Sequence, residues 1–352
     1  MKQEIINKIN RLASQDEPFL FVINYQGDKA FIRQLSDINP EECLFDFEGR
    51  GNSSDEMKNN SEKIAEISWQ IAPPLYEDYE RSFGIVKNNI MAGNSYLTNL
   101  TCKVPVSSNL SLEDIFHRAK GKYKLLLRRK RNLNPFVCFS PETFVRIKNG
   151  RIYSYPMKGT LDASLPDAEK QLMEDQKEAA EHATIVDLIR NDLSRVAENV
   201  RVDKYRYIDV LHTNKGDILQ TSSEISGRLP EDYPHHLGEI LDAQLPAGSI
   251  TGAPKDKTMQ IIQEAEGYDR GFYTGIMGIY DQGELNSAVM IRFIEEEVFP
   301  SKTENGMNSE VSRELYFKAG GGITSKSDCR KEYEEVIQKI YLPIQANPSS
   351  EY

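Results

Sequence analysis

The chain has few cysteines and no long apolar run. None of its four cysteines lies in a CxxC pair, so neither a structural zinc site nor a disulfide framework is expected; they are Cys43, Cys102, Cys138 and Cys329. No stretch approaches the roughly 20 apolar residues that a membrane-spanning helix needs. Residues 1–4 are also unlike the start of a signal peptide. We therefore expect a cytoplasmic protein with reduced thiols and no membrane partner.

Basic residues are also in the minority. The chain has 43 Lys and Arg against 54 Asp and Glu among its 352 residues, which gives a net charge of −11. An acidic balance of this size argues against nucleic acid as a partner. The apolar content of 39% is enough for a substantial core. The composition therefore indicates a soluble globular protein.

The order of the expected elements favours an α+β fold over a doubly wound sheet, because strands and helices do not alternate regularly. Residues 1–75 predict a short strand-rich N-terminal lobe within the same fold, residues 76–345 the main domain, and residues 346–352 a tail. Helices are predicted at 76–90, 166–190, 236–241, 255–264 and 329–341. Strands are predicted at 96–103, 136–139, 143–148, 151–155, 207–211, 217–225, 275–280, 287–294 and 314–319, with 301–309 a hairpin tip.

Two pairs of glutamates lie on predicted helices. Glu178 and Glu181 form one pair, and Glu332 and Glu335 the other. Side chains at i and i+3 of a helix project from one face, with Cβ atoms about 5–6 Å apart. Two such faces around one cavity would suit Mg²⁺, which prefers oxygen ligands and keeps positions open for a substrate. The alternative is that each pair belongs to an ordinary solvated helix face.

Lys158 and Glu142 are candidate catalytic residues. Lys158 could act as a nucleophile, provided that burial and a nearby divalent cation lower the pKa of its amine. Glu142 begins a predicted strand, and the turn signal Asn149-Gly150 folds the segment between them back on itself. The two side chains are therefore expected near each other. Partial burial would raise the pKa of Glu142, as a general acid requires.

Small and glycine residues mark two candidate anion sites. Residues 245–255 include Ser249 and Thr251 and precede a predicted helix, whose free backbone N–H groups favour anions. Residues 320–322 are three glycines at the end of a predicted strand, which permits a ligand to approach the backbone. An ordinary capped loop and a flexible bend are the respective alternatives.

Two basic residues are candidate carboxylate ligands. Arg292 lies in an apolar run that predicts a buried strand, so its charge needs a partner, either a bound carboxylate or one from the protein. Lys339 follows Glu335 by four residues and is expected on the same helix face. It could clamp a carboxylate substrate or form a surface ion pair of little energetic weight.

Together these segments resemble the chorismate-utilising enzymes over residues 96–339. The segments that carry the resemblance are 140–142, 156–160, 178–193, 248–255, 291–292, 320–322 and 332–335. The resemblance implies a single α+β domain of two large packed antiparallel sheets with helices outside, and a chorismate-binding catalytic domain at 76–345. Lys158 in the Pro-Met-Lys-Gly-Thr segment resembles the aminodeoxychorismate synthase branch, since anthranilate synthases typically have alanine there.

The resemblance also implies roles for individual residues. Glu181 and Glu335 would ligate Mg²⁺, with Glu178 and Glu332 holding its waters. The implied substrate-binding residues are Gly159, Ser249, Thr251, Tyr273, Arg292, Gly321, Gly322 and Lys339. Lys158 would attack C2 of chorismate while Glu142 protonates the departing 4-hydroxyl, and ammonia would then add at C4 and expel the lysine. The product would be 4-amino-4-deoxychorismate, a precursor of p-aminobenzoate and folate.

The source of ammonia and two departures from the family pattern complete the prediction. No cysteine lies in a nucleophile-elbow context, so a separate glutamine amidotransferase subunit or free ammonium is expected to supply ammonia. Gln220 stands where the family commonly has a histidine tied to pyruvate elimination, and Leu97 where isochorismate synthases have a base lysine. Anthranilate synthase component I and a non-catalytic regulatory subunit remain the alternatives.

Overall fold

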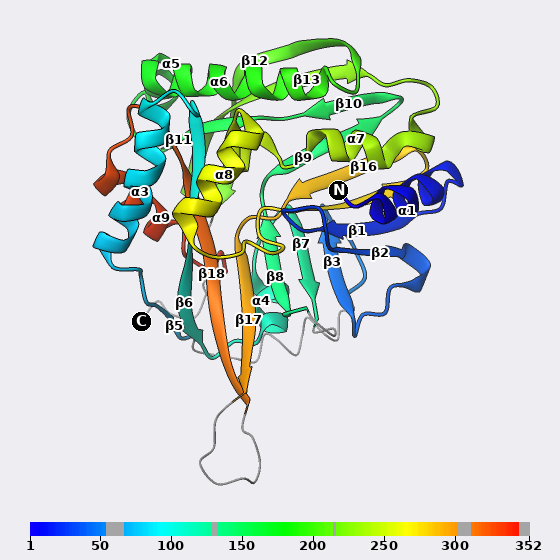
Figure 1. Ribbon diagram of the computed structural model, residues 1–352, viewed down its shortest axis with the longest axis horizontal. Helices are drawn as coiled ribbons and strands as arrows, with labels where there is room; N and C mark the ends of the chain where they lie inside the picture. Colours follow the sequence, from blue (N-terminus) through cyan, green and yellow to red (C-terminus); the bar gives the residue numbers. More distant parts are fainter. Residues whose placement is uncertain (54–66, 129–132, 214–215, 301–310, 345–352) are drawn as a thin grey trace.

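Two antiparallel sheets organise the protein, as seen in a computed structural model that describes residues 1–53, 67–128, 133–213, 216–300 and 311–344 (Figure 1). Within that part of the chain each sheet has nine strands. Sheet A runs in the order β11-β13-β10-β9-β16-β15-β1-β2, with β12 also on β13. Sheet B runs in the order β14-β6-β18-β17-β8-β7-β3-β4, with β5 also on β6. These sheets confirm the predicted α+β fold.

The strands of each sheet come from both halves of the chain. Sheet A consists of β1 (Phe19–Ile23), β2 (Ala30–Gln34), β9 (Thr143–Lys148), β10 (Arg151–Ser154), β11 (Met157–Asp162), β12 (Glu198–Thr213), β13 (Gly216–Arg228), β15 (Ile276–Asp281) and β16 (Glu284–Val289). Sheet B consists of β3 (Cys43–Phe47), β4 (Arg50–Gly51), β5 (Trp69–Ile71), β6 (Leu97–Ser108), β7 (Tyr123–Leu127), β8 (Phe136–Ser140), β14 (Gly252–Ala253), β17 (Phe293–Pro300) and β18 (Val311–Ile323).

Helices cover the outer faces of the two sheets (Figure 1). They are α1 (Gln3–Ser14), α3 (Tyr76–Met91), α4 (Leu112–Arg118), α5 (Ala168–Glu174), α6 (Gln176–Leu193), α7 (Leu237–Gln244), α8 (Lys255–Glu266) and α9 (Cys329–Gln338). Short 3₁₀ turns are η1 (Leu35–Asp37), η2 (Tyr233–His236) and η3 (Gly248–Ile250). Within the described ranges, no helix combines the length and apolarity that crossing a bilayer requires.

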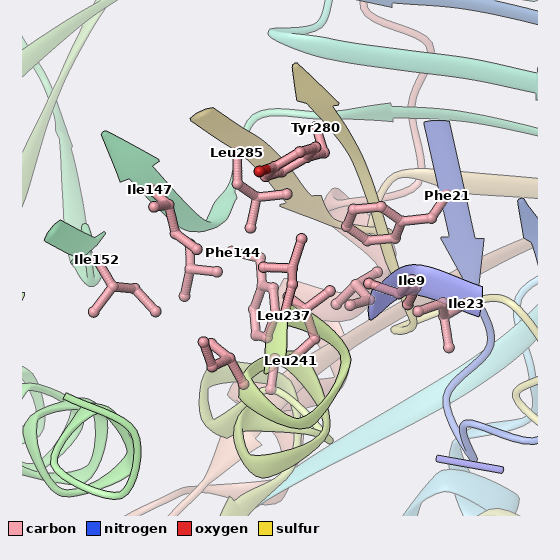
Figure 2. Close-up of a cluster of buried hydrophobic side chains, with 14 of the residues drawn as sticks. Ile9, Phe21, Ile23, Phe144, Ile147, Ile152, Leu237, Leu241, Tyr280 and Leu285 are labelled. Carbon is pink, nitrogen blue, oxygen red and sulfur yellow. The ribbon is translucent and has the colours of Figure 1, made fainter. Parts of the chain in front are cut away.

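The core is layered because buried strands present side chains to both faces. In β1 every residue is buried: Phe19 and Phe21 face the helices, whereas Leu20 and Val22 face sheet B. Figure 2 shows the helical side, where Leu237 and Leu241 of α7 lie beside Phe144 of β9, and Ile9 of α1 lies beside Phe21 and Ile23 of β1. A third cluster packs α3, α4, α8 and α9 against the opposite face of sheet B.

Several element predictions were wrong in detail. The helix predicted at 166–190 is two helices, because Asp175 ends α5 and caps α6 by accepting a bond from the Glu178 N–H at 2.9 Å. The strand predicted at 287–294 is also two: β16 belongs to sheet A and β17 to sheet B. Arg292 lies in the link between them with φ of 55°, not on a buried strand.

The first 75 residues contribute to both sheets. They begin with α1, a helix that the sequence did not predict, although Ile5, Ile9 and Leu12 recur at helical spacing and are buried. Strands β1 and β2 then join sheet A, and β3 to β5 join sheet B. The predicted hairpin tip at 301–309 and the predicted tail at 346–352 lie outside the described residues.

Candidate active site

Lys158 is held by the pairing of β11 with β13. Lys158 lies opposite Thr221, whose hydroxyl donates to the Lys158 carbonyl, and the register shifts between Lys158 and Thr160. The intervening Gly159 has φ of 79°, and a Cβ there would lie 3.1 Å from Oε2 of Glu178. A glycine at this bulge therefore allows β11 to approach the first glutamate pair closely.

The amine of Lys158 is directed at the carboxylates. Its Nζ lies 2.9 Å from Oε2 of Glu181, and the two side chains are 33% and 16% exposed. Burial opposes the charged ammonium, but Glu181, Glu178 and Glu335 outweigh it and raise the pKa of Lys158. The predicted lowering of this pKa requires a bound divalent cation as well as burial, so it stays a prediction for the metal-bound site.

The second glutamate pair lies on α9, beside the glycines of β18. A Cβ at Gly321 would lie 3.7 Å from Oε2 of Glu332 and 3.8 Å from Oε1 of Glu335. Lys339 binds Oε1 of Glu335 at 2.7 Å and donates to the Gly320 carbonyl at 3.0 Å. Residues 320–322 of β18, the glutamate pair of α9 and Lys339 therefore lie together in one polar region.

Both pairs border the same site, since the charge of Lys158 interacts with Glu178, Glu181 and Glu335. Their oxygen-only donor chemistry fits Mg²⁺. Among the described residues, however, no three His, Cys, Asp or Glu groups gather closely enough to hold a metal ion. Glu181 and Glu335 each bind a lysine instead. A metal ion bound by these carboxylates would therefore have to displace Lys158 from Glu181 and Lys339 from Glu335.

Glu142 lies directly before β9 and accepts a bond of 2.5 Å from the Ser249 hydroxyl. Burial raises the pKa of Glu142, while the Ser249 bond and the charges of Arg292 and Lys339 hold it lower. Because Lys339 also binds Glu335, which interacts with Lys158, a chain of charges connects Glu142 to Lys158.

A small cavity of about 30 Å³ adjoins Glu142. Ser249 and Gly248 of η3, Tyr155 and Pro156 before β11, and Asp192 at the end of α6 help to line it.

The other predicted substrate ligands, Arg292, Tyr273 and Thr251, differ in burial. The Arg292 guanidinium lies 5.8 Å from the centre of the Tyr341 ring, and its charge acts on Glu142. Tyr273 is buried, and burial raises its pKa against the opposing charges of Arg270 and Arg292. Thr251 is fully buried, and its carbonyl accepts a bond from the Asn99 N–H at 2.9 Å.

The two residues that depart from the family pattern lie in different sheets, Leu97 on β6 of sheet B and Gln220 on β13 of sheet A. Leu97 begins β6, and a Cβ on Gly322 would lie 3.1 Å from its Cδ1. Gln220 pairs with Thr160 of β11 and with Asp209 of β12.

Buried charges beside the site were not predicted from the sequence. Asp192 and Lys255 form an ion pair of 2.8 Å, and Glu266 and Arg270 form another of 2.6 Å. His182, next to Glu181, is buried with its Nε2 2.7 Å from the Ser223 hydroxyl. The positions of Asp192 at a helix end and of Lys255 directly after Pro254 were the available signals.

Known proteins share this architecture. The family model described as chorismate binding enzyme matches residues 15–345. An uncharacterized PabA-like protein from Haemophilus influenzae is 47% identical over 343 residues, which are 97% of each chain. Aminodeoxychorismate synthase component 1 from Salmonella typhimurium is 30% identical over 275 residues, 75% of this chain and 56% of that one. The solved anthranilate synthase component I from Streptococcus pneumoniae has a TM-score of 0.62 at 26% identity, covering 78% of this chain and 58% of that chain.

Proposed function

Because the chain belongs to the chorismate binding enzyme family, we propose that it aminates chorismate at C4 with ammonia to give 4-amino-4-deoxychorismate. The observation that supports this most strongly is the placement of Lys158, whose Nζ lies 2.9 Å from Glu181 and within the field of Glu178 and Glu335. A primary amine in such a site is a nucleophile in reach of a substrate bound to the carboxylates through a cation.

Chorismate is a dicarboxylate, so the site needs positive charge to hold it. Glu181 and Glu335 would bind Mg²⁺ directly, and Glu178 and Glu332 through its waters. The bound ion would supply charge for the ring carboxylate and offset that of the glutamates. Lys339 and Ser249 would assist there. The ligands proposed for the enolpyruvyl carboxylate are Arg292, Tyr273 and the backbone of Gly321 and Gly322.

The free amine of Lys158 would form a bond to C2 of chorismate while both ring double bonds shift by one position and the C4–O bond breaks. Glu142 would donate its proton to the departing hydroxyl, which leaves as water. Ammonia would then bond to C4 and lose a proton, and the bond between C2 and Lys158 would break. The sum is chorismate plus ammonia giving aminodeoxychorismate plus water. Because Glu181, Glu178 and Glu335 raise the pKa of Lys158, its free amine requires that their charges be offset.

We further propose that a glutamine amidotransferase subunit supplies the ammonia. Hydrolysis of glutamine by a thiol needs an accessible cysteine with a low pKa. Cys43 and Cys138 are fully buried, and burial raises the pKa of Cys43 and of Cys102 to about 12. Cys329 also has a raised pKa, again chiefly through burial.

Anthranilate synthase activity is the second candidate, supported by the likeness to the solved anthranilate synthase component I. That reaction also aminates chorismate but removes pyruvate. Lys158 and Gln220 favour the first candidate, since they stand where the resemblance places alanine and histidine in the second. A purely regulatory role has less support, because Lys158, Lys339 and the four glutamates are gathered at one site.

Mass spectrometry of the product made from chorismate, ammonium and Mg²⁺ tests the proposal. We expect aminodeoxychorismate from the natural protein and none from Lys158→Ala, while Lys331→Ala, an exposed lysine on α9, stays active. Anthranilate as the product would establish the second candidate. Full amination by Lys158→Ala would exclude the covalent role, and no conversion by the natural protein would favour a regulatory subunit.

A further inference from the structure

The segment from Gln244 to Lys255 is a loop closed at its base on one residue of α6. Lys255 Nζ donates to the Gln244 carbonyl at 2.8 Å, which joins the two ends of the loop. It also lies 2.8 Å from Oδ2 of Asp192, while Gln244 Nε2 donates to the Asp192 carbonyl at 2.9 Å. Asp192 therefore holds both ends of the loop.

The far part of the same loop reaches the candidate acid. Ser249 lies in η3, and its hydroxyl donates to Oε1 of Glu142 at 2.5 Å. The loop fits closely on α6, because a Cβ at Gly248 would lie 2.9 Å from Cδ2 of Leu188. The position of Ser249 is thus set by how the loop sits on α6.

The ion pair at the base is costly to break. The side chains of Asp192 and Lys255 are only 12% and 11% exposed. Burial raises the pKa of Asp192 and lowers that of Lys255, and the attraction between them opposes both changes. Removal of one partner leaves a buried unpaired charge, whereas replacement of both by neutral groups avoids that penalty.

The same helix also carries the first glutamate pair. Asp192 lies three turns after Glu181, about 16 Å along α6 at 1.5 Å per residue. The ion pair therefore has no contact with the carboxylates, but it joins the loop of Ser249 to the rigid helix that presents them. The groups that face Glu142 are Ser249, Arg292 and Lys339.

We infer that Asp192 and Lys255 are positioning residues, whose ion pair fixes Ser249 so that its hydroxyl holds Glu142 in place for proton donation. This inference rests on the proposed function and deepens it. A change at the base of the loop would act on the reaction through Ser249, without touching the substrate.

Three variants separate positioning from stability. Lys255→Met should lower both the melting temperature and kcat. The double variant Asp192→Asn with Lys255→Met should regain most of the melting temperature, because no unpaired charge is left. Its kcat should stay about tenfold low, a partial loss of the hundredfold or more that general acid catalysis contributes. Lys255→Arg keeps the charge and should retain activity, as should the control Lys257→Met on the exposed face of α8.

The pH profile adds a readout that loss of stability alone would not change. The hydrogen bond from Ser249 lowers the pKa of Glu142. If the double variant weakens this bond, the fall of kcat at high pH should occur at a higher pH than in the natural protein. A double variant with natural kcat and an unshifted limb would overturn the inference.

Hydrogen exchange keeps this test separate from the proposed function. Amides of residues 247–253 should exchange faster in the double variant, with those of β7, which pairs with β3 and β8, unchanged as the internal control. If the natural protein does not aminate chorismate, the proposed function fails. The exchange result then decides whether the ion pair positions Ser249: faster exchange supports the inference, and unchanged exchange overturns it.

Discussion

Replacement of Lys158 by methionine should strengthen Mg²⁺ binding while it removes amination. In the structure the Lys158 ammonium forms an ion pair with Oε2 of Glu181 at 2.9 Å, and Glu181 is proposed to bind the metal. An ion at that oxygen must displace the lysine. Methionine has a similar length and no charge, so the displacement step disappears.

The size of the effect follows from the exposure of the ion pair. The Lys158 side chain is 33% exposed and that of Glu181 is 16% exposed, so the pair lies between a surface contact and a fully buried one. Exposed pairs contribute up to about 1 kcal/mol and buried pairs several, after desolvation. A net cost of about 1–2 kcal/mol corresponds to Mg²⁺ affinity that is about 5 to 30 times higher in the variant.

Isothermal titration of the purified protein with MgCl₂ measures this affinity without any turnover. Lys331→Met is the matched control, since that lysine is exposed on α9, the helix of the second glutamate pair. Its affinity should equal that of the natural protein. Unchanged or weaker Mg²⁺ binding by Lys158→Met would refute the competition between lysine and metal for Glu181.

Two further predictions concern pH and packing. Burial raises the pKa of Glu142, so kcat should fall as the pH rises through that raised value, where the acid loses its proton. Ser249→Ala removes a hydrogen bond that favours the carboxylate, so in this variant a pH–rate profile should show the fall at higher pH. Gly278→Ala should lower the free energy of unfolding, measured by urea titration, by about 1–3 kcal/mol, because a Cβ there collides with the Phe21 ring. The control is Gly84→Ala, whose Cβ meets no atom within 4 Å and should not destabilise α3. Equal stability of these two alanine variants would contradict the close contact between Gly278 of β15 and the Phe21 ring.

The sequence predicted the fold class and most regular elements because hydrophobic periodicity is local. The predicted boundaries were wrong where tertiary or capping contacts determine how an element ends. The apolar run through Met290 continues past the point where the chain leaves sheet A for sheet B, so only the three-dimensional arrangement shows that Arg292 lies in a link. The break at Asp175 depends on a capping bond that competes with a continuous helical pattern.

The candidate site shows the same division. The spacing of each glutamate pair follows from helix geometry alone, so both pairs could be proposed from the sequence. The ion pair of Lys339 with Glu335 was one of the predicted alternatives, since the two residues are four apart in sequence, but the pair of Lys158 with Glu181 could not be predicted, because it depends on how β11 meets α6. The predicted lowering of the pKa of Lys158 depends on a bound cation as well as on burial; without the cation, the neighbouring glutamates raise that pKa.

Peptide mass spectrometry after rapid acid quench tests the covalent role of Lys158 most directly. The natural protein would be mixed with chorismate and Mg²⁺, with ammonia and glutamine left out, so that the second half of the reaction cannot proceed. The peptide containing Lys158 should then gain the mass of one chorismate less one water, and Lys158→Ala should gain nothing. Amination of chorismate at the natural rate by Lys158→Ala, with no adduct on the natural protein, would contradict the account.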